Sequence, residues 1–414
     1  MKMNLISNMG LIIIGILTGW VSWNTSLHGF CILPLVVVAC FLLPGRSFAF
    51  LFMLSYYLGS TVELFWGAIT FFDGNITSAA CLWFSQQLIL ASAWVILRKN
   101  NWHGFTEIFL QIAGTILISV FIPPYCLLGI ANPITAAGRY FPSTGFVGLG
   151  LYILMITAIV YLLSGVLIEA REKIGLIFML TGILIAAFFL NETVNIKNSP
   201  LNYPQDWVGV NTRLGRYPLD DYQKIYIRHL KLKAIAEDEI RKGKKVIIFP
   251  ESIAGFLTKT EKKLWQDIDW LAKKKKASIL LGSYLPVSQN SYDNVLFVIG
   301  TAIPNIPDGI VARISMPVTN WRLFLKPSAG LHIGLAHDGV FTIDGRNAAF
   351  LICYEQMLVW PFLQSMSGVK KVDLIVTVSN IWWANNTKIP KIMDRTCRVW
   401  GRLFNVSVLR VINI

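Results

Sequence analysis

Hydrophobic and polar positions divide the chain into two parts. From Met1 to Leu190, long apolar stretches are interrupted by isolated charges, whereas from Asn191 onward charged residues occur as often as in a soluble protein. This shift predicts a domain boundary near Asn191, with a transmembrane bundle over residues 1–191 and a second domain over residues 192–414. The second part is long enough to bury a core of its own.

Seven apolar stretches in the first part approach the length of a membrane span, which is about 20 residues. The first two are short, and we expect either two spans or one re-entrant hairpin there. The initial apolar run is too long for a cleaved signal peptide. The seven stretches are Met9–Trp23, Phe30–Leu43, Phe48–Thr70, Ala79–Leu97, Glu107–Pro123, Gly145–Leu167 and Ile174–Leu190.

Lysine and arginine in the short loops predict the orientation of this bundle, because they stay on the cytoplasmic side. With the amino terminus inside, the outer loops hold Arg139 alone. The inner loops hold Lys2, Arg46, Arg98, Lys99, Arg171 and Lys173. Seven spans then place the second domain outside the cytoplasm, and an even number of spans would reverse that placement.

Two features of the first part are not simply apolar. Glu63 lies within a predicted span, where an ionisable residue is costly and often functional; the alternative is a helix end near Asp73, where the carboxylate reaches water. The segment Ala131–Phe146 contains Pro133 and Pro142 and cannot form a regular helix. We expect it to be an outer loop packed near the second domain, or a plain connector.

Short β-branched runs alternate with charged helical segments in the second part, which predicts α/β layering. Hairpin signals, such as Asp344–Gly345 between two apolar runs, predict a sheet that is not purely parallel. Helices are predicted at Asp221–Lys242, Lys262–Lys275 and Ile392–Leu403. Strands are predicted at Val246–Phe249, Ser278–Gly282, Asn294–Gly300, Phe341–Ile343, Ala348–Cys353, Leu374–Ser379 and Val406–Ile412.

Two of these strands end in residues that carry chemistry. The strand in FPES runs into Glu251, and the strand in LICYEQ runs into Cys353. Residues at the carboxyl ends of strands face a shared crevice in layered folds. A carboxylate there can take the proton of a thiol and leave the more nucleophilic thiolate. The simpler interpretation of Cys353 is a small core residue.

The letters around these residues resemble a known superfamily. FPES and LICYE are similar to the nitrilase (carbon–nitrogen hydrolase) superfamily, which has an α-β-β-α sandwich and a Glu–Lys–Cys triad. Such a domain behind a membrane bundle resembles apolipoprotein N-acyltransferase. Four segments resemble the conjugal transfer protein TraB family more closely. They read ANPITAAGRYFP, ARISMPVTNWR, LICYEQMLVWPFLQSM and SNIWWANNTKIPKIMDRTCRVWGRLFN.

The resemblance implies roles for individual residues. Glu251 matches the general base, Cys353 the nucleophile, and Glu355 the acidic residue that follows it. The triad lysine has no direct match, because Val311–Trp321 contains none. Arg313 occupies roughly its place, and Lys326 is the nearest lysine downstream. Trp382 and Trp383 match an aromatic pair that would line an acyl-chain groove, dip into the interface or pack in the core.

Net charge and the spacing of cysteines limit the classes of partner and cofactor that we expect. The formal net charge is +14, and in a membrane protein such an excess favours anionic lipid headgroups rather than nucleic acid. The chain has no CxxC, no zinc-type spacing and five histidines, so we expect neither a metal nor another cofactor.

The resemblance implies a multi-pass protein of a bacterial inner membrane whose second domain faces the periplasm. Cys353 would take an acyl group from a phospholipid and pass it to an amine, in association with plasmid conjugal transfer. The acceptor would be a lipoprotein or a protein of the conjugation machinery. One alternative is a non-enzymatic or vestigial nitrilase-fold protein that assists conjugation. Another is an amidase acting on a small soluble substrate, which a membrane bundle argues against.

Overall fold

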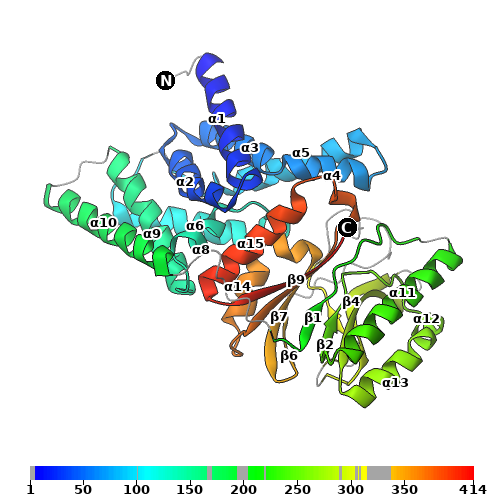
Figure 1. Ribbon diagram of the computed structural model, residues 1–414. Coiled ribbons are helices and arrows are strands. Elements are labelled where there is room, and N and C mark those ends of the chain that lie inside the picture. Colours follow the sequence, from blue (N-terminus) through cyan, green and yellow to red (C-terminus); the bar gives the residue numbers. More distant parts are fainter. Residues whose placement is uncertain are drawn as a thin grey trace. The chain divides into compact units, whose positions relative to one another are not determined.

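A computed structural model of the chain describes residues 5–99, 101–165, 170–193, 204–218, 221–288, 291–303, 306, 309–314 and 337–414. The chain divides into two units (Figure 1). The helical unit comprises Met1–Ser199, Met357–Trp360 and Asn386–Asn405. The sheet unit comprises Pro200–Gln356, Pro361–Asn385 and Val406–Ile414.

The helical unit is built from apolar helices joined by short turns. The longer ones are α1 (Leu5–Asn24), α2 (Leu33–Leu42), α3 (Arg46–Ser60), α4 (Val62–Phe71), α5 (Ile76–Ala93), α6 (Phe105–Phe121), α9 (Phe146–Leu163), α10 (Ala170–Thr193) and α15 (Ile389–Phe404). The short helical turns are η1 (Leu27–Ile32), α7 (Tyr125–Leu128), η2 (Pro133–Ala136) and α8 (Ala137–Tyr140).

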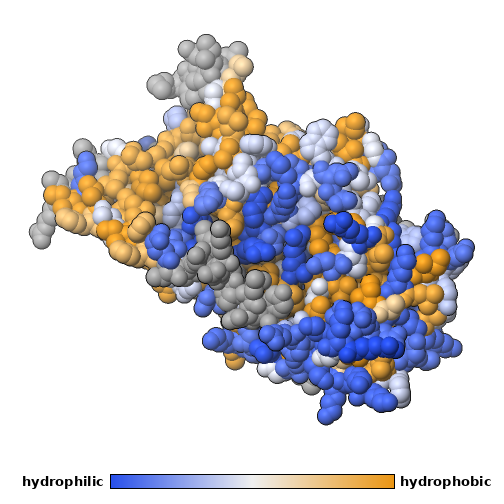
Figure 2. All heavy atoms as spheres, viewed as in Figure 1, coloured by the Kyte–Doolittle hydropathy of each residue, from blue (hydrophilic) through white to orange (hydrophobic). Residues whose placement is uncertain are grey.

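Three helices among the described residues are long and apolar enough to cross a membrane. They are α5, α9 and the part of α10 from Glu172 to Glu192, and the pair α3 and α4, bent by 55°, makes a fourth if it is one span. Figure 2 shows hydrophobic side chains over α1, α9 and α10, as expected of surfaces that face lipid. All seven predicted segments coincide with helical elements. The number of crossings stays a prediction.

Small residues let α1 and α3 approach each other closely. A Cβ atom on Gly19 would lie 2.1 Å from the carbonyl oxygen of Tyr56, and one on Gly59 would lie 2.1 Å from that of Ile16. Helices inside a membrane associate through such close backbone contact, because apolar burial offers little driving force there. A hydrogen bond also joins the two helices, in which Trp23 Nε1 donates to the Tyr56 hydroxyl at 2.8 Å.

The Pro-rich segment Ala131–Phe146 is irregular, as predicted, and is interrupted only by η2 and α8. It packs against α15 within the helical unit, where Ser143 N donates to Arg402 O and Gly145 N to Leu403 O, both at 2.8 Å. The sequence pattern placed α15 in the second domain. By its contacts α15 belongs to the helical unit, because its apolar side is buried there.

The sheet unit contains two mixed sheets. The first has the order β1-β2-β3-β4-β5, with β1, β2 and β3 parallel and the two later pairs antiparallel. The second has the order β6-β7-β8-β9, with an antiparallel β6–β7 pair and parallel neighbours after it. The strands are β1 (Trp207–Gly209), β2 (Val246–Ile248), β3 (Ser278–Ser288), β4 (Ser291–Gly300), β5 (Ile310–Val311), β6 (Val340–Ile343), β7 (Arg346–Ile352), β8 (Leu374–Asn380) and β9 (Ser407–Asn413).

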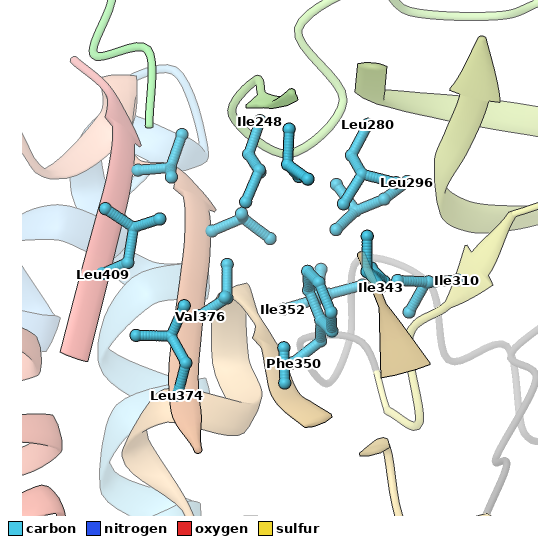
Figure 3. Packing of buried hydrophobic residues seen from close by; sticks show 14 of the residues in the cluster. Ile248, Leu280, Leu296, Ile310, Ile343, Phe350, Ile352, Leu374, Val376 and Leu409 are labelled. Atoms are coloured by element: carbon cyan, nitrogen blue, oxygen red, sulfur yellow. The ribbon is translucent and has the colours of Figure 1, made fainter. Parts of the chain in front are cut away.

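The two sheets pack face to face. Figure 3 shows Ile248 and Leu280 of the first sheet in one buried cluster with Ile352 and Val376 of the second. A second cluster fills the space between the other face of the first sheet and α11 (Tyr222–Arg241) and α13 (Gln266–Lys275). The sheet unit therefore contains a layer of helices against two packed sheets, which agrees with the α/β layering that the alternating pattern predicts; the complete α-β-β-α sandwich stays a prediction.

Most predicted elements of this unit are confirmed, with local differences. The helix predicted at Lys262–Lys275 is two helices, α12 (Lys259–Leu264) and α13, because the chain bends at the buried Trp265. The short strands β1 and β5 were not predicted. Neither were α14 (Val359–Ser367) and the turns η4 (Cys353–Met357) and η5 (Trp382–Ala384).

Candidate active site

Glu251 follows β2 directly, at the carboxyl end of a strand that is buried throughout. The next residue, Ser252, has a φ of +46°, which turns the chain sharply after the carboxylate. Strand β3 runs so close to this turn that a Cβ on Gly282 would lie 1.8 Å from the carbonyl oxygen of Pro250. The backbone of both strands thus fixes the position of Glu251.

The carboxylate of Glu251 is 7% exposed and accepts hydrogen bonds from three sides. Its Oε1 accepts from Asn294 Nδ2 at 2.7 Å, and its Oε2 from the backbone N–H of Asn380 at 3.0 Å. The thiol of Cys353 forms the third hydrogen bond with it. The structure thus brings Glu251 and Cys353 together, one from each sheet.

Cys353 begins η4, immediately after β7, and has a φ of +51°. Only a few per cent of residues other than glycine adopt positive φ, and such strain gathers at functional sites. The side chain is half-buried, and the backbone N–H of Tyr354 is hydrogen bonded to its sulfur. That N–H stabilises negative charge on the sulfur and thus favours the thiolate form needed for attack.

Burial sets the protonation of this pair. Removal from water raises the pKa of Glu251, although the hydrogen bonds from Cys353, Asn380 and Asn294 oppose the shift. Removal from water also raises the pKa of Cys353, and the adjacent Glu251 raises it further. The thiol is therefore protonated at rest. A carboxylate with a raised pKa is a stronger base, suited to take the thiol proton during attack.

A second layer of amides supports Asn380. Its Oδ1 accepts from Asn413 Nδ2 at 2.7 Å, and its Nδ2 donates to Ser252 Oγ at 3.2 Å. Asn413, fully buried at the end of β9, accepts at Oδ1 from the hydroxyl of Thr212 at 2.8 Å. The ends of β2, β8 and β9 are thus linked through side chains.

Arg313 and Glu355 form a buried ion pair in which each side chain is 1% exposed and Nη2 lies 3.0 Å from Oε2. The backbone N–H of Arg313 also donates to Oε1 at 2.5 Å. Because Glu355 lies two residues after Cys353, the pair holds the turn that carries the thiol. The guanidinium donates further to Asp338 O, Phe350 O, Pro361 O and Ser365 Oγ, all at 3.0 Å.

Three further residues were predicted to belong to the site: Lys326, Trp382 and Trp383. Lys326 lies outside the described residues. Trp382 is half-buried in η5, with the guanidinium of Arg216 4.9 Å from its ring centroid, and Trp383 is buried beside it. An acyl-binding role for these tryptophans stays a prediction.

Sequence reasoning missed the amides Asn294, Asn380 and Asn413, and also Tyr284. Burial raises the pKa of Tyr284, and nearby Glu251 raises it further, so its ring lies close to the pair. The available signal was a polar residue that ends an apolar strand, as in LIVTVSN and SVLRVIN. Within the part of the chain that the structure describes, no group of His, Cys, Asp and Glu could hold a metal ion.

Glu63 occupies the first turn of α4, where the chain bends after α3. Its Oε2 accepts from the backbone N–H of Lys388, the residue that caps the amino terminus of α15, at 2.9 Å. A carboxylate at that position balances the partial positive charge of the helix end. The half-buried carboxylate thus has a partner within the helical unit.

The apolar helices are compatible with membrane association, and the sheet unit carries a thiol–carboxylate pair typical of cysteine nucleophiles. The chain belongs to the conjugal transfer protein TraB family, which the sequence segments above had indicated. It is 30% identical over 407 residues to the "Probable conjugal transfer protein TraB" of Sinorhizobium fredii (strain NBRC 101917 / NGR234), over 95% of each chain.

The Conjugal transfer protein TraB of Agrobacterium fabrum (strain C58 / ATCC 33970) is 26% identical over 433 residues, covering 97% of this chain and 92% of that protein. No family model matches the chain.

Proposed function

We propose that this protein is a membrane-bound acyltransferase of nitrilase type that serves conjugal transfer. The observation that carries the proposal is the hydrogen bond between the buried Glu251 carboxylate and the Cys353 thiol, at the ends of strands from two packed sheets. Both relatives are named as conjugal transfer proteins, which supports the role in conjugation.

In the proposed reaction, the sulfur of Cys353 attacks the ester carbon of a phospholipid while Glu251 takes the thiol proton. The ester C–O bond then breaks, and the leaving alcohol receives that proton. An amine attacks the resulting thioester, the C–S bond breaks, and the product is an amide with the thiol restored. The Tyr354 N–H would stabilise the developing thiolate, and Lys326 is the proposed cation for the oxyanion.

The proposed setting is a bacterial inner membrane, crossed several times by the helical unit, with the sheet unit on the periplasmic side. Apolar helices and a lipid substrate fit such a setting, because an ester of a phospholipid is reached at the membrane. The acceptor would be an amine on a lipoprotein or on a protein of the conjugation machinery. No cofactor takes part in the proposed steps.

The test is covalent labelling of the purified full chain with a phospholipid that carries a labelled acyl group. We expect a hydroxylamine-sensitive adduct in the wild type and none in Cys353→Ala. Cys397→Ala is the matched control, because Cys397 is buried in α15 of the helical unit, and this variant should keep the adduct. Absence of the adduct in the wild type, with normal conjugation by Cys353→Ala, would overturn the proposal.

One observation favours a second candidate, a non-catalytic nitrilase-like protein that assists conjugation. Among the described residues, the contacts of Glu251 and Cys353 come from amides and backbone N–H groups, and Arg313 is committed to Glu355. A triad without its cation would lose transition-state stabilisation. Normal conjugation by Cys353→Ala supports this second function.

A further inference from the structure

The helical unit contains a buried arginine that no carboxylate among the described residues neutralises. Arg98 follows α5 and is 1% exposed. Its Nη2 donates to the carbonyl oxygens of Phe41 and Leu43, but its Nε and Nη1 are buried and have no acceptor among the described residues. The sequence predicted that Arg98 lies in a short loop, where its charge would be solvated by water.

The cost of this arrangement is large. Removal of a charge from water is expensive unless the charge is paired and hydrogen bonded. The carbonyl oxygens at Nη2 supply only partial negative charge. The three hydrogens on Nε and Nη1 form no hydrogen bond with the described residues. Arg46 adds a second positive charge nearby, because its Nε donates to the carbonyl oxygen of Arg98 at 2.7 Å.

Arg98 lines a cavity of about 360 Å³ at this end of the helical unit. The volume falls within the range of pockets that hold small ligands. The described residues around it come from the turn after α2, from the segment after α5 and from the end of α9. They are Phe41, Leu42, Leu43, Pro44, Asn101, Trp102, Leu163, Ser164 and Gly165. Apart from Arg98, none of these side chains is charged.

The carboxylate closest in sequence is already engaged. Glu107 accepts from Lys99 Nζ at 2.8 Å and from the backbone N–H of His103 at 2.9 Å, on the exposed side of the segment. The amide oxygen of Gln111 accepts from the N–H of Lys99. Neither group reaches the free nitrogens of Arg98.

We propose that this cavity binds a phosphate-bearing anion, with Arg98 as its principal ligand. A guanidinium forms strong, directional hydrogen bonds to phosphate oxygens, and an anion would supply both the missing charge and the missing acceptors. Leu42 and Leu43 are half-buried and add apolar atoms to a lining that is otherwise largely polar, so the carbon atoms next to a phosphate group would lie beside them. The phosphate belongs either to a lipid headgroup or to a free anion. This site is independent of the reaction proposed for Cys353.

The test follows thermal unfolding of the full-length protein in detergent by tryptophan fluorescence, in phosphate-free buffer at constant ionic strength. Inorganic phosphate, a short-chain phosphatidylglycerol and a short-chain diacylglycerol without phosphate are titrated separately. We expect a saturable rise of the midpoint with the phosphatidylglycerol and none with the diacylglycerol. A rise with inorganic phosphate as well identifies the phosphate group as sufficient, whereas a rise with the lipid alone identifies a headgroup site.

Two variants and one control make the test specific. Arg98→Met should abolish the rise, and so should Ser164→Phe, which fills the cavity while keeping the arginine. Lys99→Met removes a neighbouring cation whose side chain is 63% exposed and outside the cavity, and should keep the rise. The proposal is overturned if neither phosphate compound raises the wild-type midpoint, or if the rise persists in Ser164→Phe.

Discussion

Among the described residues, the two most deeply buried arginines lie in different units, and their charges are balanced in opposite ways. Arg313 in the sheet unit meets a carboxylate at 3.0 Å and four further oxygen acceptors. Arg98 in the helical unit meets two carbonyl oxygens and faces a cavity. Both side chains are 1% exposed, so burial alone does not distinguish them.

The difference teaches how to separate a structural charge from a ligand-binding one. A structural cation is satisfied by the fold itself, because an unpaired buried charge would unfold a marginally stable protein. A cation with unused hydrogen-bond donors beside a cavity is satisfied only when a ligand that carries acceptors binds in the cavity. The number of unused donors is therefore a better guide than burial or net charge.

The largest expected effect tests the satisfied arginine. Arg313→Met leaves Glu355 buried without its cation and should cost about 3–5 kcal/mol of stability. The double variant Arg313→Met/Glu355→Leu removes both charges and should recover most of that loss. Urea unfolding of the full chain in detergent measures both. By comparison, Arg98→Met in phosphate-free buffer should lower the free energy of unfolding far less. An equal loss of stability at both arginines would contradict the distinction between a structural and a ligand-binding arginine.

An intermediate effect concerns Glu251, which has hydrogen-bond donors but no cation among its described contacts. Burial raises its pKa, so the folded protein binds the proton more tightly than the unfolded chain does. The protonated form contributes stability at low pH, and that contribution is lost as the pH rises through the folded pKa. Glu251→Gln cannot ionise, so its midpoint should exceed that of the wild type by a margin that grows from pH 5 to pH 8.

The glutamine should fit because Asn294 can adapt. Its Oδ1 is buried and has no hydrogen-bond partner, so rotation of the amide by 180° would present an acceptor to the new NH₂ group. Asn294→Leu in the same background removes this possibility and serves as the control. A margin that shrinks with rising pH would show that Glu251 is stabilised as the anion.

The smallest effect concerns Glu63, whose charge faces the amino terminus of α15. Glu63→Gln keeps an acceptor for Lys388 N but removes the charge, and should cost about 0.3–1 kcal/mol, measured by the same unfolding assay. Glu63→Ala removes the acceptor as well and should cost more. If Glu63→Gln keeps its stability yet stops conjugation, the carboxylate has a chemical role rather than a capping one.

Local patterns predicted the framework of both units well. Apolar runs such as the one ending at Ser379 became buried strands, and Asp221 became the N-cap of α11, accepting from Lys224 N at 3.0 Å. The positions of Glu251 and Cys353 at the ends of strands also predicted the site. Side chains that leave the ends of strands in two packed sheets are close enough to contact each other. The break at Trp265 escaped prediction, since the residues on both sides favour helix.

Contacts between residues far apart in the sequence could not be predicted from local patterns. Asn413 supports Asn380 from 33 residues away, and Arg98 is covered by carbonyl oxygens 55 and 57 residues earlier. Arg313 took the place of the expected triad lysine in the sequence pattern, yet its position in space is set by Glu355. Spacing along the chain could not show which oxygen each guanidinium would find.

The path of the chain around α15 has a consequence for biosynthesis. The chain leaves the sheet unit after β8, forms α15 within the helical unit and returns as β9 beside β8. The ribosome synthesises α15 after the other helices of its unit, so those helices lack their contacts with α15 until the chain is almost complete. Each unit is thus completed only when the other nears completion. A fragment of residues 192–414 would expose Ile392, Val399 and Leu403, and we expect it to need chaperones or to aggregate.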